Sequence, residues 1–476
     1  KSSKVDEYIE QRSLYILETC VCYLLLSRNQ KLISMELERC KLLTHAELGF
    51  STKSMVRIIT YELLLLHNGN SEHNAYLSDV LGQLMLLIKK NKERLVQIGA
   101  TLLQPLQVLL LSSDCWCRDR LLGNSDYWSI FRCFASSPKN TARVYEFIEG
   151  IIHEQRDLVQ YKNYMDVLGL LDEISAVGAY GAQWEQERDK LISKGVDVSQ
   201  KKNPFEKLVS TSLKSISLTG KLGQILKSTE FQKSMKHATP ELDKKGHIIS
   251  PWYPLIEAIS HQCYNPCREL RNHALKTLTT ILLSNELPMD ELSSEAVMES
   301  GCFRLLEQLC EPDVTNTDPN GMMKTQQNAI NLSCKAILLY KFKNPNHEVI
   351  RLLNITDKLL QKNSKNRDFK EETLEIEKNA LRVKISEYDI KQLESSKISL
   401  DLKRMLLEAA KGMNEANIEV ATADNTSNKS DKAENKNDKL SKEAGETEAS
   451  SKDESEVNNP AQVEDNVSTE KDAEKK

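Results

Sequence analysis

The sequence predicts an all-α protein, a HEAT- or armadillo-like α-solenoid of helical hairpins that ends in a disordered C-terminal tail. Apolar residues recur at helical spacing over nearly all of residues 5–411, and the alternation typical of strands is absent from the sequence. The periodic stretches pair into units of roughly 35–45 residues, which is the length of a two-helix repeat. Such a hairpin cannot bury its apolar stripe alone, so it requires neighbours stacked on it.

Residues 1–200 are predicted to form a first helical-repeat domain. Its helices are separated by turn-forming or proline-containing stops, the clearest at residues 68–70 and at Ser137-Pro138. We expect helices within residues 5–26, 51–67, 74–95, 93–113, 124–138, 139–155, 161–175 and 181–193.

Residues 204–411 are predicted to form a second helical-repeat domain, which follows a polar boundary at residues 193–204. Helix resumes at Phe205, and the polar stretch 238–251 is expected to be a surface loop. Further helices are expected within residues 296–310 and 321–341, on either side of a turn at residues 315–321.

The stretch 251–278 shows the hairpin pattern most clearly. Pro266 separates two amphipathic helices, because proline supplies no N–H and disfavours helix in the residue before it. The apolar stripes of the two helices comprise Trp252, Leu255, Ile256, Ile259 and Cys263, followed by Cys267, Leu270, Ala274, Leu278, Ile281 and Leu282.

Residues 412–476 are predicted to be a disordered charged tail. After Ala423 the sequence contains one leucine and no isoleucine, methionine or aromatic residue, so it cannot bury enough apolar surface to offset chain entropy. Residues 424–476 hold 15 acidic and 9 basic residues, which leaves residues 1–423 with a net charge of +1. A nearly neutral folded part offers no field for wrapping nucleic acid, so no nucleic-acid partner is expected.

Cysteine usage and hydropathy indicate a cytosolic chain. The 11 cysteines lie mostly within apolar helical faces, which is typical of reduced thiols that pack as small hydrophobic groups. No signal peptide is recognisable, and no apolar run approaches the roughly 20 residues that a membrane span requires. The chain begins at Lys1 rather than methionine, and we interpret it as a piece of a longer protein.

No motif predicts catalysis, and we expect neither a cofactor nor a metal. His261, Cys263, Cys267 and His273 cluster around the Pro266 corner and could in principle hold zinc, but their spacing matches no finger pattern and packing in the core is favoured. Cys115 and Cys117 are expected to point to different sides of a helix. Phosphate-binding, zinc-protease and nucleophile-elbow motifs are also absent from the sequence.

One segment could instead lie on a membrane surface. Its polar face is rich in serine and threonine and carries few charges, as in helices that sense lipid packing. Burial of the same stripe within the solenoid is the favoured interpretation. The candidate lipid-facing residues are Phe205, Leu208, Val209, Leu213 and Ile216.

The 251–278 hairpin resembles one found downstream of the catalytic domain in large Arf guanine-nucleotide exchange factors. The resemblance extends in order over most of residues 5–345 and favours the Golgi GBF/Gea type over the trans-Golgi BIG type. No counterpart of the catalytic domain is recognisable, and residues 343–413 are shorter and more charged than the family pattern. The motif residues are Trp252, Pro254, Leu255, Cys263, Arg268, Arg271, Ala274, Leu275 and Leu278, followed by Gly321, Met322 and Thr325.

The resemblance implies a non-catalytic C-terminal region of a Golgi Arf exchange factor, which recruits the enzyme to membranes and transmits regulatory input in ER–Golgi and intra-Golgi vesicle traffic. It also implies that the partners are small GTPases of the Arf and Rab families. The protein would be cytoplasmic and peripherally associated with Golgi membranes. The chain would be part of a larger protein, with dimerisation left open. The alternative is an unrelated HEAT-repeat adaptor or transport receptor.

Four residues of the hairpin are expected to be structural anchors: Trp252, Leu255, Arg271 and Leu278. The matching tryptophan in the family suggests that Trp252 lies between successive helical layers. Arg271 is expected to bond to the preceding corner, where Asn265 stands in place of the usual aspartate. That bond would have a neutral acceptor rather than an ion-pair partner, and would contribute about 1 kcal/mol.

Overall fold

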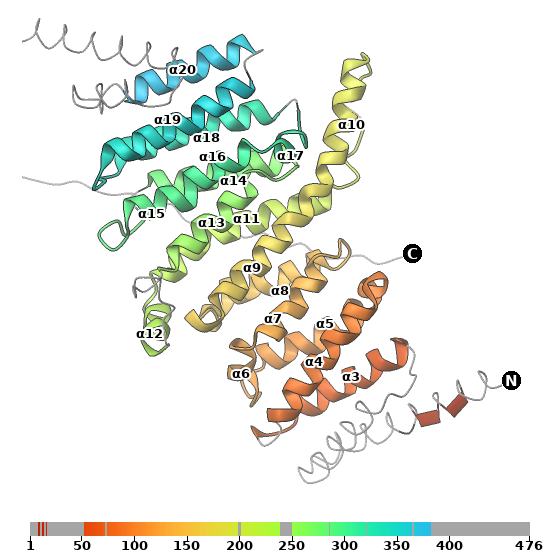
Figure 1. Cartoon of the computed structure of the whole chain (residues 1–476). Helices are drawn as coiled ribbons and strands as arrows, with labels where there is room; N and C mark the ends of the chain where they lie inside the picture. Colours follow the sequence, from red (N-terminus) through yellow and green to blue (C-terminus); the bar gives the residue numbers. More distant parts are fainter. Residues whose placement is uncertain are drawn as a thin grey trace, which may run out of the picture. The chain divides into compact units, whose positions relative to one another are not determined.

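The computed structural model describes residues 8–9, 12–13, 16, 52–71, 74–198, 201–238, 250–284, 286–319, 321–363 and 366–381. They lie within one compact unit that spans Lys1–Glu415. Every regular element among these residues is a helix (Figure 1), which confirms the all-α prediction. Most of the predicted start at residues 5–26, the end of the second predicted domain and the predicted tail at 412–476 lie outside the described residues.

The elements up to residue 193 follow the predicted order. They are α3 (Thr52–His67), α4 (Asn74–Lys90), η2 (Lys92–Arg94), α5 (Leu95–Leu111), α6 (Arg118–Leu122), α7 (Ser125–Ala135), α8 (Thr141–Glu154), η3 (Arg156–Leu158), α9 (Tyr161–Val177), η4 (Gly178–Tyr180) and α10 (Gly181–Ser193).

The remaining elements continue the same pattern. They are α11 (Glu206–Leu226), α12 (Thr229–His237), α13 (Trp252–Gln262), α14 (Arg268–Leu283), α15 (Ser294–Met298), η5 (Glu299–Phe303, a π-helical turn), α16 (Arg304–Leu309), α17 (Pro312–Thr315), α18 (Met322–Leu339), α19 (Pro345–Lys362) and α20 (Arg367–Leu381).

The helices stack in two rows, as in a solenoid (Figure 1). One row runs α8, α11, α14, α18 and α20, each packed against the next. The other runs α4, α7, α9 and α13, and continues through η5 with α16 and α19. The apolar faces meet between the rows in one hydrophobic core that extends from Val56 to Leu359. Stacking of amphipathic hairpins therefore buries the stripes that periodicity identified.

The 251–278 hairpin folds as the pattern predicts. All eleven stripe residues, from Trp252 to Leu282, are buried. The first helix ends at Gln262 and the second begins at Arg268, so the break falls around Pro266. The division into domains near residue 200 stays a prediction, although α11 packs directly on α9 across that boundary.

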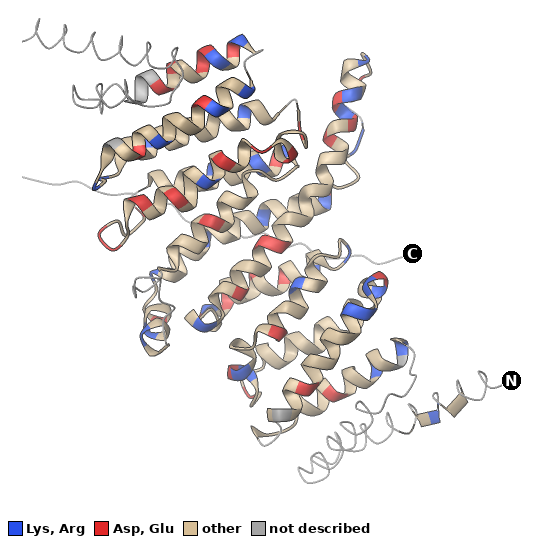
Figure 2. Ribbon diagram, viewed as in Figure 1, with Lys and Arg blue, Asp and Glu red and all other residues tan. Residues whose placement is uncertain are grey.

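Helix α10 continues the line of α9 through a short 3₁₀ turn and extends away from the neighbouring helices (Figure 1). The glycines of this turn allow a close approach of α11 and α14. A Cβ on Gly178 would lie 2.5 Å from Leu270 Cδ1, and one on Gly181 would lie 2.6 Å from Val209 Cγ2. Figure 2 shows charges of both signs along α10.

One stretch departs from the sequence-based expectation about membrane spans. Among the described residues, Lys92–Leu111 has the length and apolar composition to cross a membrane, so the expectation that no run reaches this length is wrong. In this structure the stretch belongs to the helical stack, because α5 packs against α3, α6 and α7. Its apolar side chains include the fully buried Leu102, Leu106 and Leu109.

Candidate functional site

The corner between α13 and α14 is closed by the Asn265 side chain. Its Oδ1 accepts a hydrogen bond from the Cys267 amide at 3.0 Å, and its Nδ2 donates to Gln262 Oε1 at 2.9 Å. A short amide side chain that bonds two residues onward stabilises a turn. The corner is therefore a fixed structure, and it presents two backbone carbonyls, of Asn265 and Pro266, to the helix that follows.

Arg271 fills the space beneath this corner and is completely buried. Its Nη1 donates to the carbonyl oxygens of Asn265 and Pro266 at 2.9 and 2.8 Å, and its Nε donates to Thr325 Oγ1 at 3.1 Å. Its Nη2 forms an ion pair with Asp318. The prediction of a neutral acceptor alone is therefore wrong: the corner carbonyls are neutral, but a carboxylate from the loop between α17 and α18 completes the site.

Asp318 is shared between two arginines. Arg268 Nε and Nη2 approach its two oxygens at 3.0 and 2.8 Å, and Arg268 Nη2 also donates to Asp189 on α10 at 2.9 Å. The Gly321 amide donates to Asp318 Oδ1 at 3.0 Å. Burial acts to raise the pKa of Asp318, but the hydrogen bonds from Arg268 and Arg271 outweigh it and lower that pKa to about 2. Asp318 is therefore a carboxylate at neutral pH.

A carboxylate from α10 supplies the cap that α14 lacks. The first residues of a helix leave backbone N–H groups without partners, and Cys267 at the N-cap offers no side-chain acceptor. Glu185 accepts from the Arg268 amide at 2.7 Å and from the Glu269 amide at 3.1 Å. Its negative charge also suits the positive end of the helix dipole.

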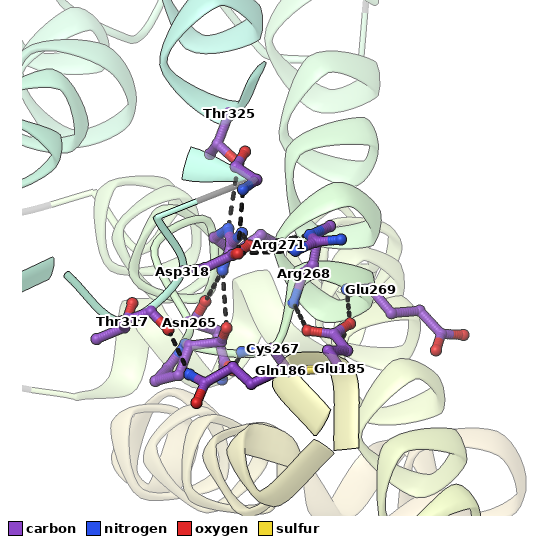
Figure 3. Close-up of polar contacts among 12 residues, drawn as sticks. Glu185, Gln186, Asn265, Cys267, Arg268, Glu269, Arg271, Thr317, Asp318 and Thr325 are labelled. Carbon is purple, nitrogen blue, oxygen red and sulfur yellow. Dashed lines mark hydrogen bonds and ion pairs between the residues drawn. The ribbon is translucent and has the colours of Figure 1, made fainter. Parts of the chain in front are cut away.

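These contacts form a cluster that we call the polar junction, drawn in Figure 3. Gln186 of α10 adds a hydrogen bond to the Thr317 carbonyl at 2.8 Å. The junction ties α10, the start of α14 and the start of α18 together, and its donors and acceptors are largely consumed within the chain. It is arranged to hold helices rather than to transform a substrate. Its charged or hydroxyl members are Glu185, Asp189, Arg268, Arg271, Asp318 and Thr325.

The polar junction explains a glycine in the sequence. A Cβ at position 321 would collide with Asp318 Oδ2 and Arg268 Nε, the two atoms that form one arm of the Arg268–Asp318 pair. Only glycine leaves the space that this pair occupies. Gly321, Thr325, Arg268 and Arg271 all appear in the motifs quoted above, so those motifs converge on one three-dimensional site.

Trp252, Leu255 and Leu278 lie in the core beside the junction. Trp252 is 6% exposed, and a Cβ on Gly223 of α11 would lie 3.1 Å from its ring carbons. Lys227 Nζ lies 5.8 Å from the centre of the ring, within the range of a cation–π interaction. Leu255 and Leu278 are fully buried. The Trp252 ring therefore lies between α13 and α11, in the position expected of an anchor.

The four zinc-ligand candidates make other contacts. His261 Nδ1 lies 2.9 Å from Asp172, and this carboxylate raises the pKa of the imidazole. Cys263 is buried, Cys267 Sγ lies 3.6 Å from Glu185 Oε1, and His273 Nε2 lies 2.7 Å from Ser217 Oγ. The described residues contain no group of three or more such side chains placed to hold a metal.

Cys115 and Cys117 contradict the expectation that they point apart. Their Sγ atoms lie 3.2 Å from each other in the turn between α5 and α6. The prediction applied helical spacing to residues that follow the expected helix 93–113. Residues 112–117 form a non-helical turn that brings the two side chains to one side. The hydrogen bond between the two thiols lowers the pKa of the Cys115 thiol.

The segment considered for lipid binding packs into the stack as part of α11. Val209 and Ile216 are 3% and 1% exposed, while Phe205 and Leu213 are partly buried against the core. Leu208 is also half-buried. Ser212 and Ser215 are polar residues of the same helix, but both are buried. Their hydroxyls donate to the α9 carbonyls of Ile174 and Leu171, both at 2.8 Å. These contacts favour burial of the stripe.

A substitution at Leu213 separates the two interpretations of α11. Because Leu213 is only half-buried, Leu213→Asp is expected to cost about 1–2 kcal/mol of unfolding free energy, less than full burial of an apolar side chain would imply. Urea unfolding of the variant measures this cost, with Lys214→Asp on the exposed neighbour as the control. An unchanged unfolding free energy combined with lost flotation on liposomes would show instead that this face binds lipid.

The low pKa of Asp318 predicts acid sensitivity. In the unfolded chain the carboxyl titrates near its ordinary pKa of about 3.9, so its stabilising effect is complete above that pH and is lost as the pH falls from about 4 towards 2. The expected loss is about 2 kcal/mol. Unfolding free energies at pH 5 and pH 2.5 measure it, and Asp318→Asn should remove this part of the pH dependence. An equal loss in Asp318→Asn would assign the effect to other carboxyls.

Comparisons with known proteins bear on the same region. Residues 252–410, which begin with the hairpin and include Arg268, Arg271, Asp318 and Thr325, match the family described as "GBF1-like, tetratrico peptide repeat region". The chain is also 30% identical over 312 residues to ARF guanine-nucleotide exchange factor 2 of Saccharomyces cerevisiae. The chain is related to the GBF/Gea-type Arf exchange factors. The predicted resemblance is confirmed.

The relation covers part of much longer proteins. ARF guanine-nucleotide exchange factor 1 of the same yeast is 26% identical over 313 residues, and each alignment covers 64% of this chain. The chain spans about a fifth of the curated relatives it matches, 20% and 21% of their lengths. The family match thus falls on a helical-repeat segment, residues 252–410. Two members of the polar junction, Glu185 and Asp189, come from α10, which precedes that segment.

Proposed function

We propose that this chain is the non-catalytic C-terminal scaffold of a Golgi Arf exchange factor, which recruits the enzyme to membranes and transmits regulatory input. The match of residues 252–410 to the GBF1-like repeat region carries the proposal. The polar junction supports it, because its arginines and carboxylates are committed to holding helices. A stacked-helix scaffold suits recognition, since repeat proteins bind partners along extended surfaces.

The partners that follow from this proposal are small GTPases of the Arf and Rab families and the cytoplasmic surface of Golgi membranes. The names of the yeast relatives support Arf as one of them. The protein would act in ER–Golgi and intra-Golgi vesicle traffic as a peripheral membrane protein. The order of shared motifs and the relatives' identity favour this role over an unrelated adaptor or transport receptor.

An exchange assay tests the non-catalytic part of the proposal. The purified chain is expected to leave GDP release from Arf at its intrinsic rate, with and without liposomes, because the family match falls on a repeat region. Tryptophan fluorescence of Arf during nucleotide exchange measures the rate, and an isolated exchange domain provides the positive control. Acceleration by the chain alone would contradict the proposal.

A deletion tests the recruiting role. In the full-length protein, removal of the part represented here is expected to preserve exchange on soluble Arf and to abolish Golgi localisation of a fluorescent fusion. Normal localisation of the deleted protein would overturn the recruiting role. Absence of an exchange domain from the sequence encoded upstream of Lys1 would favour the adaptor instead.

A further inference from the structure

A groove separates the exposed faces of α14 and α18, two neighbours of the same row. It encloses about 670 Å³ and is open to solvent. Its floor is apolar, since Leu275 and Leu332 lie at the base and are 5% and 3% exposed. The lining residues are Asn272, Leu275, Lys276, Thr279, Thr280, Lys324, Asn328, Asn331, Leu332 and Lys335.

The charged groups of this groove all have the same sign. Lys276, Lys324 and Lys335 line it, and the described lining residues include no carboxylate. All three lysines are exposed. Lys324 Nζ reaches Gln327 Oε1 at 3.5 Å, while Lys276 and Lys335 make no hydrogen bond or ion pair within the described chain. The groove therefore offers uncompensated positive charge to an anionic ligand.

Three carboxamides lie among these lysines without partners. Asn272, Asn328 and Asn331 line the groove, and their side chains make no hydrogen bond within the part of the chain that is described. A carboxamide both donates and accepts, so it can bond the N–H and the C=O of one residue in an extended peptide. Asn328 and Asn331 are one helical turn apart and project from the same side of α18.

The basic character continues onto α11, the next helix of the row. Its exposed side chains include Lys207, Lys214 and Lys221, and its single acidic residue, Glu206, lies in the first turn. On the α11 side, a charged ligand longer than the groove would therefore meet further lysines. On the other side of α18, α20 exposes Glu371, Glu372 and Glu375, so the ligand is expected to extend from the groove towards α11. This matches an extended polyanion better than a compact one.

We propose that the α14–α18 groove binds an extended acidic segment of a partner protein. The asparagines would hold its backbone and the lysines its carboxylates. A membrane is disfavoured, because lipid-binding surfaces insert exposed apolar side chains and the leucines here are buried. This surface goes beyond the proposed scaffold role and does not rest on it, since its chemistry is the same whether or not an exchange domain accompanies the chain.

Fluorescence anisotropy with the full chain tests the proposal. The probe is a labelled 12-residue peptide of alternating serine and glutamate, compared with the serine–lysine peptide of the same length. We expect binding of the acidic peptide only, with an affinity that falls as salt is added. Lack of binding by the acidic peptide, or equal binding of both peptides, would overturn the proposal.

Two pairs of substitutions, at the half-buried Asn328 and Asn331 and at the exposed Lys276 and Lys335, separate backbone recognition from charge alone. Asn328→Ala with Asn331→Ala is expected to weaken binding at least 10-fold while keeping the salt dependence. Lys276→Gln with Lys335→Gln should weaken binding and reduce the salt dependence. Lys358→Gln, on α19 in the other row, is the matched control and should change neither. If the asparagine variant bound the acidic peptide as tightly as the unchanged chain, the proposed site would be wrong. Binding of anionic liposomes or single-stranded RNA through the same lysines, more tightly than the acidic peptide, would also overturn the proposal.

Discussion

Replacing Arg271 with alanine is expected to lower the free energy of unfolding by about 3–5 kcal/mol, the range for breaking a buried ion pair by removing one partner. Arg271 is fully buried and its guanidinium contacts Asp318, Thr325 and two corner carbonyls. Removal of the guanidinium takes away these hydrogen bonds and half of the charge that compensates Asp318. This cost is well above the 1 kcal/mol expected of a single neutral hydrogen bond.

Urea unfolding of the purified variant measures the loss. Arg268→Ala is the matched control, because its side chain also binds Asp318 but is 26% exposed, so water can replace part of its contacts. It should cost clearly less than Arg271→Ala. A loss below about 1.5 kcal/mol for Arg271→Ala would mean that the polar junction contributes little to stability.

A paired substitution isolates the ionic part of the effect. Arg271→Met with Asp318→Leu removes both charges and keeps apolar volume, and buried pairs replaced in this way are often tolerated. The double variant should therefore be more stable than Arg271→Met alone. If the double variant lost the sum of the two single losses, Arg271 and Asp318 would act independently.

The helices could be predicted from the sequence because local periodicity decides where apolar side chains gather. The corner at Pro266 is equally local, since it depends on the properties of two adjacent residues. The buried stripe from Trp252 to Cys263 followed from spacing alone. Stacking in a solenoid adds contacts mainly between near neighbours, so the architecture follows from the hairpin.

The polar junction could not be predicted in the same way, because its members are distant in sequence. Asp318 lies 47 residues after Arg271, in a stretch whose sequence indicates only a turn. Glu185 lies 83 residues before Arg268, whose amide donates to its carboxylate. Spacing on one helix gives no information about such pairs. The motifs that carried the family resemblance contained the missing signal, since Gly321 and Thr325 belong to the same site.

The Cys115–Cys117 pair shows the opposite limitation. The expectation that the two thiols diverge is right for a helix, where residues two apart occupy different sides. The chain leaves the helix at Ser112, and the turn that follows brings the Sγ atoms together. The helix expected from the sequence already ends at residue 113, so the rule for helical spacing does not apply to residues 115–117.

Trp252→Ala is expected to cost about 3–5 kcal/mol, the range for truncating a buried tryptophan. The indole is 6% exposed and packs against Gly223, where the missing side chain of the glycine leaves room for the ring. Alanine would leave a cavity between α13 and α11, two helices of different rows, and the surrounding helices cannot collapse fully into it. Losses of similar size are therefore expected for Trp252→Ala and Arg271→Ala, whereas the sequence predicted only about 1 kcal/mol for the bond of Arg271.

Urea unfolding again measures the cost of Trp252→Ala, with Tyr253→Ala as the matched control. Tyr253 is the adjacent aromatic residue of α13, but it is only partly buried and its hydroxyl accepts from the Ser293 amide at 3.0 Å. Its truncation should cost clearly less, because part of its surface already contacts water. If the two truncations cost the same, the ring of Trp252 would not be the anchor between α13 and α11. In that case the hairpin would be held chiefly by the polar junction, and Arg271→Ala would cost more than Trp252→Ala.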